Sequence, residues 1–320
     1  MTHTVPQSMK AAVMHNTREI KIETLPVPDI NHDEVLIKVM AVGICGSDLH
    51  YYTNGRIGNY VVEKPFILGH ECAGEIAAVG SSVDQFKLGD RVAVEPGVTC
   101  GRCEACKEGR YNLCPDVQFL ATPPVDGAFV QYIKMRHDFV FLIPDSLSYE
   151  DAALIEPFSV GIHAAARTKL QPGSTIAIMG MGPVGLMAVA AAKAFGAGTI
   201  IVTDLEPLRL EAAKKWERPM SSISMNRTRL KRLRRLRMKE ALMLLGKQRG
   251  IQRHCNLHWL LCAGAGNWRL SVCLHRTRFR SMCRLLRIMR LIFTGSSVMP
   301  IRIQRELNFS LPALWTQSIL

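Results

Sequence analysis

One stretch of the chain, residues 174–204, restricts the fold more than any other. It begins with a short apolar run, residues 174–179, of the kind that forms a buried strand, and this run leads into the motif GMGPVG at residues 180–185. An alanine-rich helical pattern follows, and a second strand pattern at residues 199–203 ends at Asp204. A Gly-x-Gly-x-x-Gly motif between a strand and a helix predicts the start of a doubly wound α/β sheet.

The same stretch predicts a dinucleotide site. The glycines allow a pyrophosphate to approach the helix N-terminus, where backbone N–H groups and the helix dipole attract negative charge. Asp204 can hold both ribose hydroxyls, and because its carboxylate would repel a 2′-phosphate, NAD is favoured over NADP. The alternative is a structural tight turn followed by a solvated aspartate. The predicted cofactor-binding residues are Gly180, Gly182, Pro183, Val184, Gly185, Asp204 and Arg209.

Earlier in the chain, a cysteine, a histidine and a glutamate predict a metal site. Cys45 lies in GICGSD at residues 43–48, and His70 and Glu71 lie in GHECAG at residues 69–74. A thiolate, an imidazole and a carboxylate form a three-ligand zinc set, and a catalytic zinc keeps its fourth position open for water or substrate. Taken alone, each residue is better explained as a buried thiol or a satisfied core side chain.

Four further cysteines predict a second, structural metal site. Their spacing, Cys-x2-Cys-x2-Cys-x7-Cys, allows four thiolates to surround one zinc ion tetrahedrally and leaves no open position. Metal binding at such a site is folding free energy, on the order of 10 kcal/mol in zinc-finger peptides. This lobe is therefore expected to become more rigid when it takes up metal. The four ligands are Cys100, Cys103, Cys106 and Cys114.

Composition divides the chain at residue 215. Residues 1–215 hold 19 Lys+Arg and 24 Asp+Glu, a net charge of −5, whereas residues 216–320 hold 21 and 3, a net charge of +18; the two sum to the +13 of the whole chain. Residues 1–156 carry short alternating strand patterns separated by Pro and Gly, which predicts a β-rich zinc domain. Residues 157–215 then form the first part of a Rossmann NAD-binding domain.

The sequence also predicts where the protein works. No apolar run is long enough to span a bilayer, and the first residues lack the order of a signal peptide. A cytoplasmic protein is expected, without membrane partners. Its ten cysteines are accordingly interpreted as metal ligands and free thiols rather than disulfides.

These motifs together resemble the zinc-containing medium-chain alcohol dehydrogenases. Residues 69–92, from GHE to GDRV, are similar to that family's zinc signature. Tyr51, Glu71 directly after His70, and the segment EPFSV at residues 156–160 resemble the sorbitol (L-iditol 2-) dehydrogenase branch, in its bacterial, Bacillus type, over residues 1–215. The resemblance implies a GroES-like catalytic domain, a Rossmann domain, and zinc- and NAD-dependent oxidation of sorbitol, xylitol or L-iditol to the 2-ketose. Threonine is an alternative substrate, and the intact family member would be a homotetramer.

The resemblance implies roles for individual side chains. Zinc on the three-ligand set would polarise a polyol hydroxyl and lower its pKa. Glu156 would hold the zinc-bound water or act as an exchanging ligand. Ser47 and His50 would pass the proton to solvent, although His50 is also explained as an ordinary surface histidine, and Asp48 would orient a ligand. The implied substrate-pocket residues are Tyr51, Phe119 and Thr122.

Residues 216–320 do not continue the predicted sheet. A doubly wound fold needs a third strand and further crossovers after residue 215, and none is evident in the sequence. Residues 227–239 form a basic run with leucines at irregular helical spacing. As functional sequence, this run would bind nucleic acid or an anionic membrane. A non-enzymatic or aggregating chain dominated by its basic tail is therefore the alternative to a dehydrogenase, although nucleic acid is the less favoured partner.

The tail is better explained as the same gene translated out of frame. Trp and Met have one codon each, so WERPM at residues 216–220 can be regrouped one base earlier, and the new codons permit Met-Gly-Ala-Thr-His, the kind of segment that the family carries there. SSVMP at residues 296–300 likewise permits Ile-Phe-Arg-Tyr-Ala. The pair Lys214-Lys215 implies a run of adenines, and the loss of one would cause this shift. The chain as written is therefore expected to pack sparsely beyond residue 215 and to turn over little substrate.

Overall fold

A computed structural model describes residues 5–63, 65–204, 206–216, 221–222, 257–262 and 270–274. Within these residues the chain forms two compact units, one ending at Glu156 and the other beginning at Pro157. The first unit contains β1 (Ser8–Asn16), β2 (Glu19–Pro26), β3 (Glu34–Val42), α1 (Gly46–Asn54), β4 (Arg56–Ile57), β5 (Tyr60–Val61), β6 (Phe66–Ile67), β7 (Cys72–Val79), β8 (Arg91–Val94), β9 (Gly97–Val98), α2 (Glu104–Lys107), η1 (Tyr111–Leu113), β10 (Gln118–Phe119), β11 (Tyr132–Arg136), η2 (His137–Phe139), β12 (Val140–Leu142) and α3 (Tyr149–Ala153).

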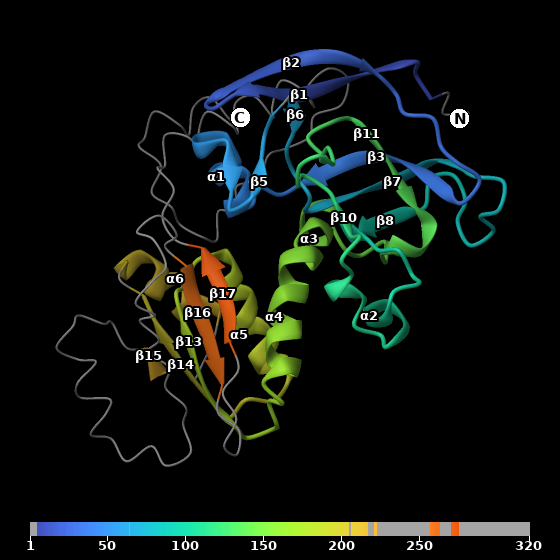
Figure 1. Ribbon diagram of the computed structural model, residues 1–320. Coiled ribbons are helices and arrows are strands. Elements are labelled where there is room, and N and C mark those ends of the chain that lie inside the picture. The colour runs from blue at the N-terminus through green and yellow to red at the C-terminus, as the bar shows by residue number, and fades with distance from the viewer. Residues whose placement is uncertain are drawn as a thin grey trace. The chain divides into compact units, whose positions relative to one another are not determined.

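The main sheet of the first unit has the strand order β11-β3-β7-β8-β12, and all of its pairs are antiparallel. Figure 1 shows β3, β7 and β8 side by side. In β3, Val35, Ile37 and Val39 are buried on one face, whereas on the other face Glu34 and Lys38 are partly exposed and Leu36 is buried. This alternation is the period-2 pattern of a half-buried strand. A second sheet, β2-β1-β6, packs into the same apolar core.

A glycine fixes how closely β3 and β7 approach. Gly74 pairs with Val39 next to a register shift in β3, and a Cβ built on it would lie 2.1 Å from the carbonyl oxygen of Lys38 and 2.8 Å from Ile37 Cγ2. No ordinary Cβ contact is that short, so any larger residue forces the two strands apart. Because β7 follows directly after Glu71, the position of this strand also determines where that predicted metal ligand lies.

Helix α3 lies on a row of alanines that crosses three strands. Ala73 pairs with Ala41 of β3 and with Ala93 of β8. Ala152 and Ala153 of α3 belong to the same small apolar cluster as these three residues. Small side chains on both surfaces allow the short helix to approach the sheet closely.

The second unit contains α4 (Ile155–Arg167), whose first two residues belong to the first unit, β13 (Thr175–Met179), α5 (Pro183–Ala194), β14 (Thr199–Thr203), α6 (Pro207–Trp216), β15 (Ser221–Ser222), β16 (Leu257–Cys262) and β17 (Leu270–Leu274). The predicted strand, glycine-rich turn, helix and second strand all form. β13 and β14 pair in parallel from Thr175 opposite Thr199 to Met179 opposite Thr203.

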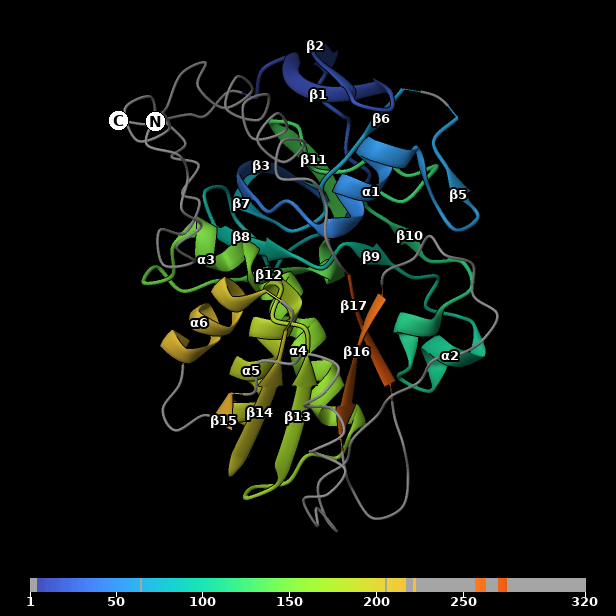
Figure 2. The ribbon, with the colours of Figure 1, turned by 90° about the vertical axis from the view of Figure 1, so that its left-hand side faces the viewer.

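Although the sequence shows no continuation of the doubly wound pattern after residue 215, three strands from that part of the chain join the sheet. The sheet has the order β15-β14-β13-β16-β17, and Figure 2 shows β16 beside β13. β15 extends the parallel part by two residues, whereas β16 and β17 are antiparallel to their neighbours. The open edge of β13 offers unpaired backbone groups, and the mostly apolar run at residues 257–262 can pair with them. The described sheet is therefore mixed, and the basic run at residues 227–239 lies outside the described residues.

Among the helices that the structure describes, none is long and apolar enough to cross a membrane.

We expect Gly74→Ala to lower the free energy of unfolding of the first unit by more than about 2 kcal/mol, because the added methyl group collides with backbone that cannot move independently of the sheet. Gly58→Ala is the control: Gly58 has φ 57°, but a Cβ there meets no atom within 4 Å. It should cost only about 1 kcal/mol of backbone strain. Denaturant unfolding followed by circular dichroism measures both, and equal losses would contradict the steric interpretation.

Candidate functional site

The position of Cys45 is fixed by the start of α1. Its backbone N–H donates to Asp48 Oδ2 at 2.8 Å, and its side chain accepts from the backbone N–H of Asp48, so that the two residues form a capping box. The side chain of Ser47 also hydrogen-bonds to the thiol. A cysteine at the N-terminus of this helix is thereby held in one orientation before any metal binds.

His70 and Glu71 lie immediately before β7. Gly69 adopts φ 91°, and a Cβ on it would lie 2.2 Å from the ring of Phe129, so both the backbone conformation and the space require glycine. The backbone N–H of Gly69 donates to Asp48 Oδ1 at 2.9 Å. Asp48 Oδ1 is also 3.9 Å from His70 Nδ1. The buried carboxylate of Asp48 thus links the cysteine segment to the histidine segment.

The structure brings the three predicted donors together. The ligand atoms of Cys45, His70 and Glu71 all lie within 4.8 Å of one another, with the histidine and the glutamate buried. Burial, followed by the charge of Glu156, raises the pKa of Glu71 to about 8. Burial, followed by the charges of Glu71 and Asp48, also raises the pKa of the Cys45 thiol. Donors that bind zinc as anions are held among other acids, so the cluster suits a divalent cation that would offset their mutual repulsion.

The three other predicted catalytic residues lie around this donor set in different ways. Ser47 contacts the Cys45 thiol. His50 is half-buried on α1, with Nδ1 3.3 Å from Asn54 Nδ2, and burial lowers its pKa. Burial raises the pKa of Glu156, and the nearby His70 opposes that rise. The carboxyl group of Glu156 thus lies within electrostatic reach of the histidine but is not one of the three clustered donors.

Of the three predicted substrate residues, Phe119 contacts His70, and Tyr51 and Thr122 contact each other. The ring of Phe119 meets the His70 imidazole edge-on, with 5.5 Å between ring centroids. Thr122 hydrogen-bonds to the Tyr51 phenol, whose pKa is raised by burial. Between Phe119 and Thr122, Ala121 has φ 57°, which is uncommon for a residue with a side chain. The sequence carries no signal for this left-handed residue, and its role in directing the loop was missed.

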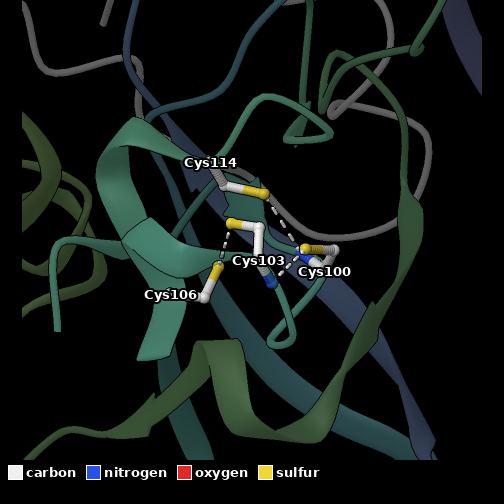
Figure 3. Close-up of side chains that lie close together, drawn as sticks. All are labelled: Cys100, Cys103, Cys106 and Cys114. Atoms are coloured by element: carbon white, nitrogen blue, oxygen red, sulfur yellow. Dashed lines mark hydrogen bonds between the residues drawn. The ribbon is translucent and has the colours of Figure 1, made fainter. Parts of the chain in front are cut away.

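The four clustered cysteines converge as their spacing predicts. Their sulfur atoms lie within 4.8 Å of one another, and Figure 3 shows the side chains pointing toward a common centre. Cys103 Sγ is 3.4 Å from Cys106 Sγ, and the backbone N–H of Cys103 donates to Cys100 Sγ at 3.4 Å. Hydrogen bonds from the backbone of Arg102 and Cys103 lower the pKa of Cys100 to about 7. This set suits a closed tetrahedral site.

In the second unit, the glycine-rich turn packs closely against the start of α5. A Cβ on Gly185 would lie 1.9 Å from the carbonyl oxygen of Gly180, so the helix and the turn approach as only glycine allows. Gly182 is the N-cap of α5, and Pro183 and Val184 are its first residues, in the first turn where backbone N–H groups lack helical partners.

Asp204 has more partners than the sequence suggests. Its Oδ2 accepts from the backbone N–H of Met181 at 2.7 Å, and its Oδ1 accepts from the backbone N–H of Glu206 at 2.8 Å. Arg209 Nη1 lies 3.7 Å from Oδ2. Each carboxylate oxygen has two acceptor positions, so one remains on each oxygen for a ribose hydroxyl. Asp204 therefore connects the glycine-rich turn to the end of β14, a role that the motif alone does not reveal.

Comparison with known proteins agrees with this geometry. Residues 31–145 match the family described as alcohol dehydrogenase GroES-like domain. An alcohol dehydrogenase of Thermus sp. ATN1 is 30% identical, with a TM-score of 0.65 over 73% of this chain and 68% of that one. The chain belongs to the zinc-containing medium-chain alcohol dehydrogenases. The predicted family and α/β fold class are thus confirmed, and zinc and NAD are the cofactors of its sorbitol dehydrogenase members.

Two curated relatives narrow the resemblance within the family. The sorbitol dehydrogenase of Bacillus subtilis is 98% identical over 215 residues, which are 67% of this chain and 61% of that protein. The sorbitol dehydrogenase of Mus musculus is 48% identical over 203 residues, 63% of this chain and 57% of that protein. The chain therefore spans about three fifths of the length of the curated relatives that it matches.

We expect Cys103→Ser to remove one bound zinc ion per chain and to lower the unfolding temperature of the first unit, because three remaining thiolates cannot close a tetrahedral site. Cys72→Ala, a buried cysteine outside the four-thiol group, is the control and should leave the zinc content unchanged. Elemental analysis of purified protein gives both values. Full zinc content in Cys103→Ser would show that the four thiols do not form one site.

Proposed function

We propose that the protein is a zinc- and NAD-dependent polyol dehydrogenase that oxidises sorbitol, and related polyols such as xylitol and L-iditol, to the 2-ketose. The observation that carries this proposal is the convergence of the Cys45, His70 and Glu71 donors within 4.8 Å in a chain that is 98% identical to a sorbitol dehydrogenase over 215 residues. The alternative is threonine 3-dehydrogenase activity, in which the same alcohol oxidation takes place on the secondary alcohol of threonine.

The residues of the first unit would divide the work as follows. Cys45, His70 and Glu71 would hold zinc, which when bound supplies a Lewis acid that lowers the pKa of the substrate hydroxyl. Ser47 would accept the hydroxyl proton, and His50, half-buried on α1, would pass it to solvent. Glu156 would place a further negative charge beside the three donors, which would offset part of the positive charge of a bound zinc ion.

The rest of the pocket would orient the polyol. The Tyr51 phenol and the Thr122 hydroxyl form a hydrogen-bonded pair that suits a chain of hydroxyl groups. Phe119, packed against His70, would supply an apolar wall and exclude water.

In the second unit, the predicted residues would hold NAD, which supplies the hydride acceptor. The N-terminus of α5 would bind the pyrophosphate, and Asp204 would bind the ribose through the acceptor positions that its two backbone hydrogen bonds leave available. Arg209, already beside Asp204, would lie near the adenosine. The carboxylate of Asp204 would also disfavour a 2′-phosphate, so NAD is preferred to NADP.

We expect a polyol-dependent rise in NADH absorbance from a chain whose reading frame is restored after residue 215, and its loss on treatment with a chelator. Glu71→Gln should lower kcat/KM by about a hundredfold or more, because the neutral amide binds zinc more weakly. The Lewis acid effect of the zinc ion is worth several kcal/mol. Asp204→Asn should raise KM for NAD while retaining zinc, and is the matched control for metal content. A zinc-replete protein that oxidises none of the polyols would contradict the proposal.

We further propose that the tail from residue 216 onward is out of frame and that the chain as written has little or no activity. Antiparallel β16 and β17 occupy the edge of β13, where a doubly wound fold would continue the sheet in parallel. Native domains retain only about 5–15 kcal/mol of net stability. The free energy lost by replacing half of the sheet would exceed that margin.

DNA sequencing across the Lys214-Lys215 codons tests this second proposal. We expect an adenine run there, and insertion of one adenine should restore both the reading frame and polyol-dependent turnover at least a hundredfold above that of the chain as written. An intact frame with no adenine run, or full activity in the chain as written, would contradict it.

A further inference from the structure

We infer that Tyr149 is a positioning residue that keeps Glu156 against the Cys45–His70–Glu71 site by fastening α3 to the strand that follows Glu71. The inference rests on the proposed function only in requiring that this site binds a divalent metal. Tyr149 and its partners Glu75 and Arg91 are not among the predicted metal ligands, although Glu75 and Arg91 lie within the signature at residues 69–92.

The contact starts from a cross-strand pair. Glu75 of β7 stands directly opposite Arg91 of β8. The Tyr149 hydroxyl donates to Glu75 Oε1 at 2.6 Å, and the Arg91 guanidinium lies over the Tyr149 ring, 4.4 Å from its centroid. One tyrosine thus makes a charge-assisted hydrogen bond to the first partner and a cation–π contact with the second. The first residue of α3 is tied to two central strands of the sheet.

Arg91 also fixes the loop that leads into α3. Its two terminal nitrogens donate to the carbonyl oxygens of Pro144 and Leu147, at 3.0 and 2.6 Å. Both hydrogen bonds require the planar guanidinium to stay in one orientation. The stacked Tyr149 ring favours that same orientation, so the loop and the helix are held by one connected group of residues, which we call the Tyr149 clamp: Glu75, Arg91 and Tyr149.

The Tyr149 clamp is close in sequence to two residues at the metal site, Glu71 and Glu156. β7 begins at Cys72, next to Glu71, and carries Glu75 four residues after that ligand. On the other side, α3 ends at Ala153 and α4 begins at Ile155, so Glu156 follows the clamped helix by three residues. The alanine row of Ala41, Ala73 and Ala93 supports α3. Glu71 and Glu156 are therefore placed by segments that the clamp fastens together.

Such fastening is needed because the two carboxyl groups repel each other. The charge of Glu156, a partly exposed residue, acts on Glu71 and Cys72, which are both buried. Glu156 lies in the first turn of α4 and follows the short helix α3 by three residues, so its position depends on whether α3 stays against the sheet. We expect loss of the clamp to let Glu156 withdraw, which removes a negative charge from beside the bound metal and weakens its retention.

The test uses the full chain with cobalt in place of zinc, so that it needs no turnover. The visible absorption band that Cys45→Ser removes reports the three-donor site, separately from the four-thiol site. The variant is Tyr149→Phe, and the matched control is Tyr132→Phe, a half-buried tyrosine of β11 whose hydroxyl has no hydrogen-bond partner among the described residues. Release of cobalt to a chelator is measured for wild type, for both variants, and for each in a Glu156→Gln background.

Tyr149→Phe should release cobalt from this site about tenfold faster than wild type, the factor that corresponds to one charge-assisted hydrogen bond, and should shift the site's absorption band. Tyr132→Phe should do neither. In the Glu156→Gln background, Tyr149→Phe should change the release rate less than twofold. Equal effects with and without Glu156, or a lowered unfolding temperature with unchanged band and release, would overturn the inference. Absence of any band sensitive to Cys45→Ser would instead contradict the proposed function.

Discussion

The metal-site candidate of the first unit brings two buried carboxyl groups and a partly buried thiol together beside one imidazole. Asp48, Glu71 and Cys45 lie in a space where burial raises the pKa of each. A fold gains nothing from such a cluster in the absence of a cation, because each ionised donor destabilises the next. The cluster persists because backbone groups hold it: Asp48 accepts hydrogen bonds from the N–H groups of both Cys45 and Gly69. The left-handed Gly69 and the capping box thus hold together donors that a bound divalent cation would stabilise.

Most of this site could be predicted from sequence because its chemistry is carried by residue type and spacing. Cys103 and Cys106 are separated by two residues, and a turn of that length brings their sulfur atoms to 3.4 Å without any long-range information. Cys45 and His70 are twenty-five positions apart, so their convergence required the family resemblance in addition to the residue types. The alternation in β3 likewise predicts a strand by itself, since its period reflects burial on one face.

Other features could not be predicted because they depend on contacts between distant segments. Tyr149 is a helix residue with no distinctive neighbours in sequence, and its hydrogen bond to Glu75 spans 74 positions. The hydrogen bond from the Met181 N–H to Asp204 follows from the approach of the glycine-rich turn to β14, which the motif implies only in general terms. β16 and β17 were missed for a different reason: the sequence after residue 215 lacks the alternation of strands and helices that predicts a parallel sheet, and antiparallel pairing at an open edge does not need that pattern.

The Met181 N–H of the glycine-rich turn donates to Asp204, so under the proposed function the order of this turn and the recognition of the ribose would depend on the same carboxylate. Replacing the aspartate would remove an acceptor for the ribose and would also leave the Met181 N–H without its partner, although Met181 is almost fully buried. An unsatisfied buried N–H costs about 1–3 kcal/mol, so a change made to alter cofactor choice would also loosen the turn that binds the pyrophosphate. Under the proposed function, selectivity and affinity for the dinucleotide would therefore be coupled in this unit. The coupling is local, since all of the atoms involved lie between the end of β13 and the start of α6.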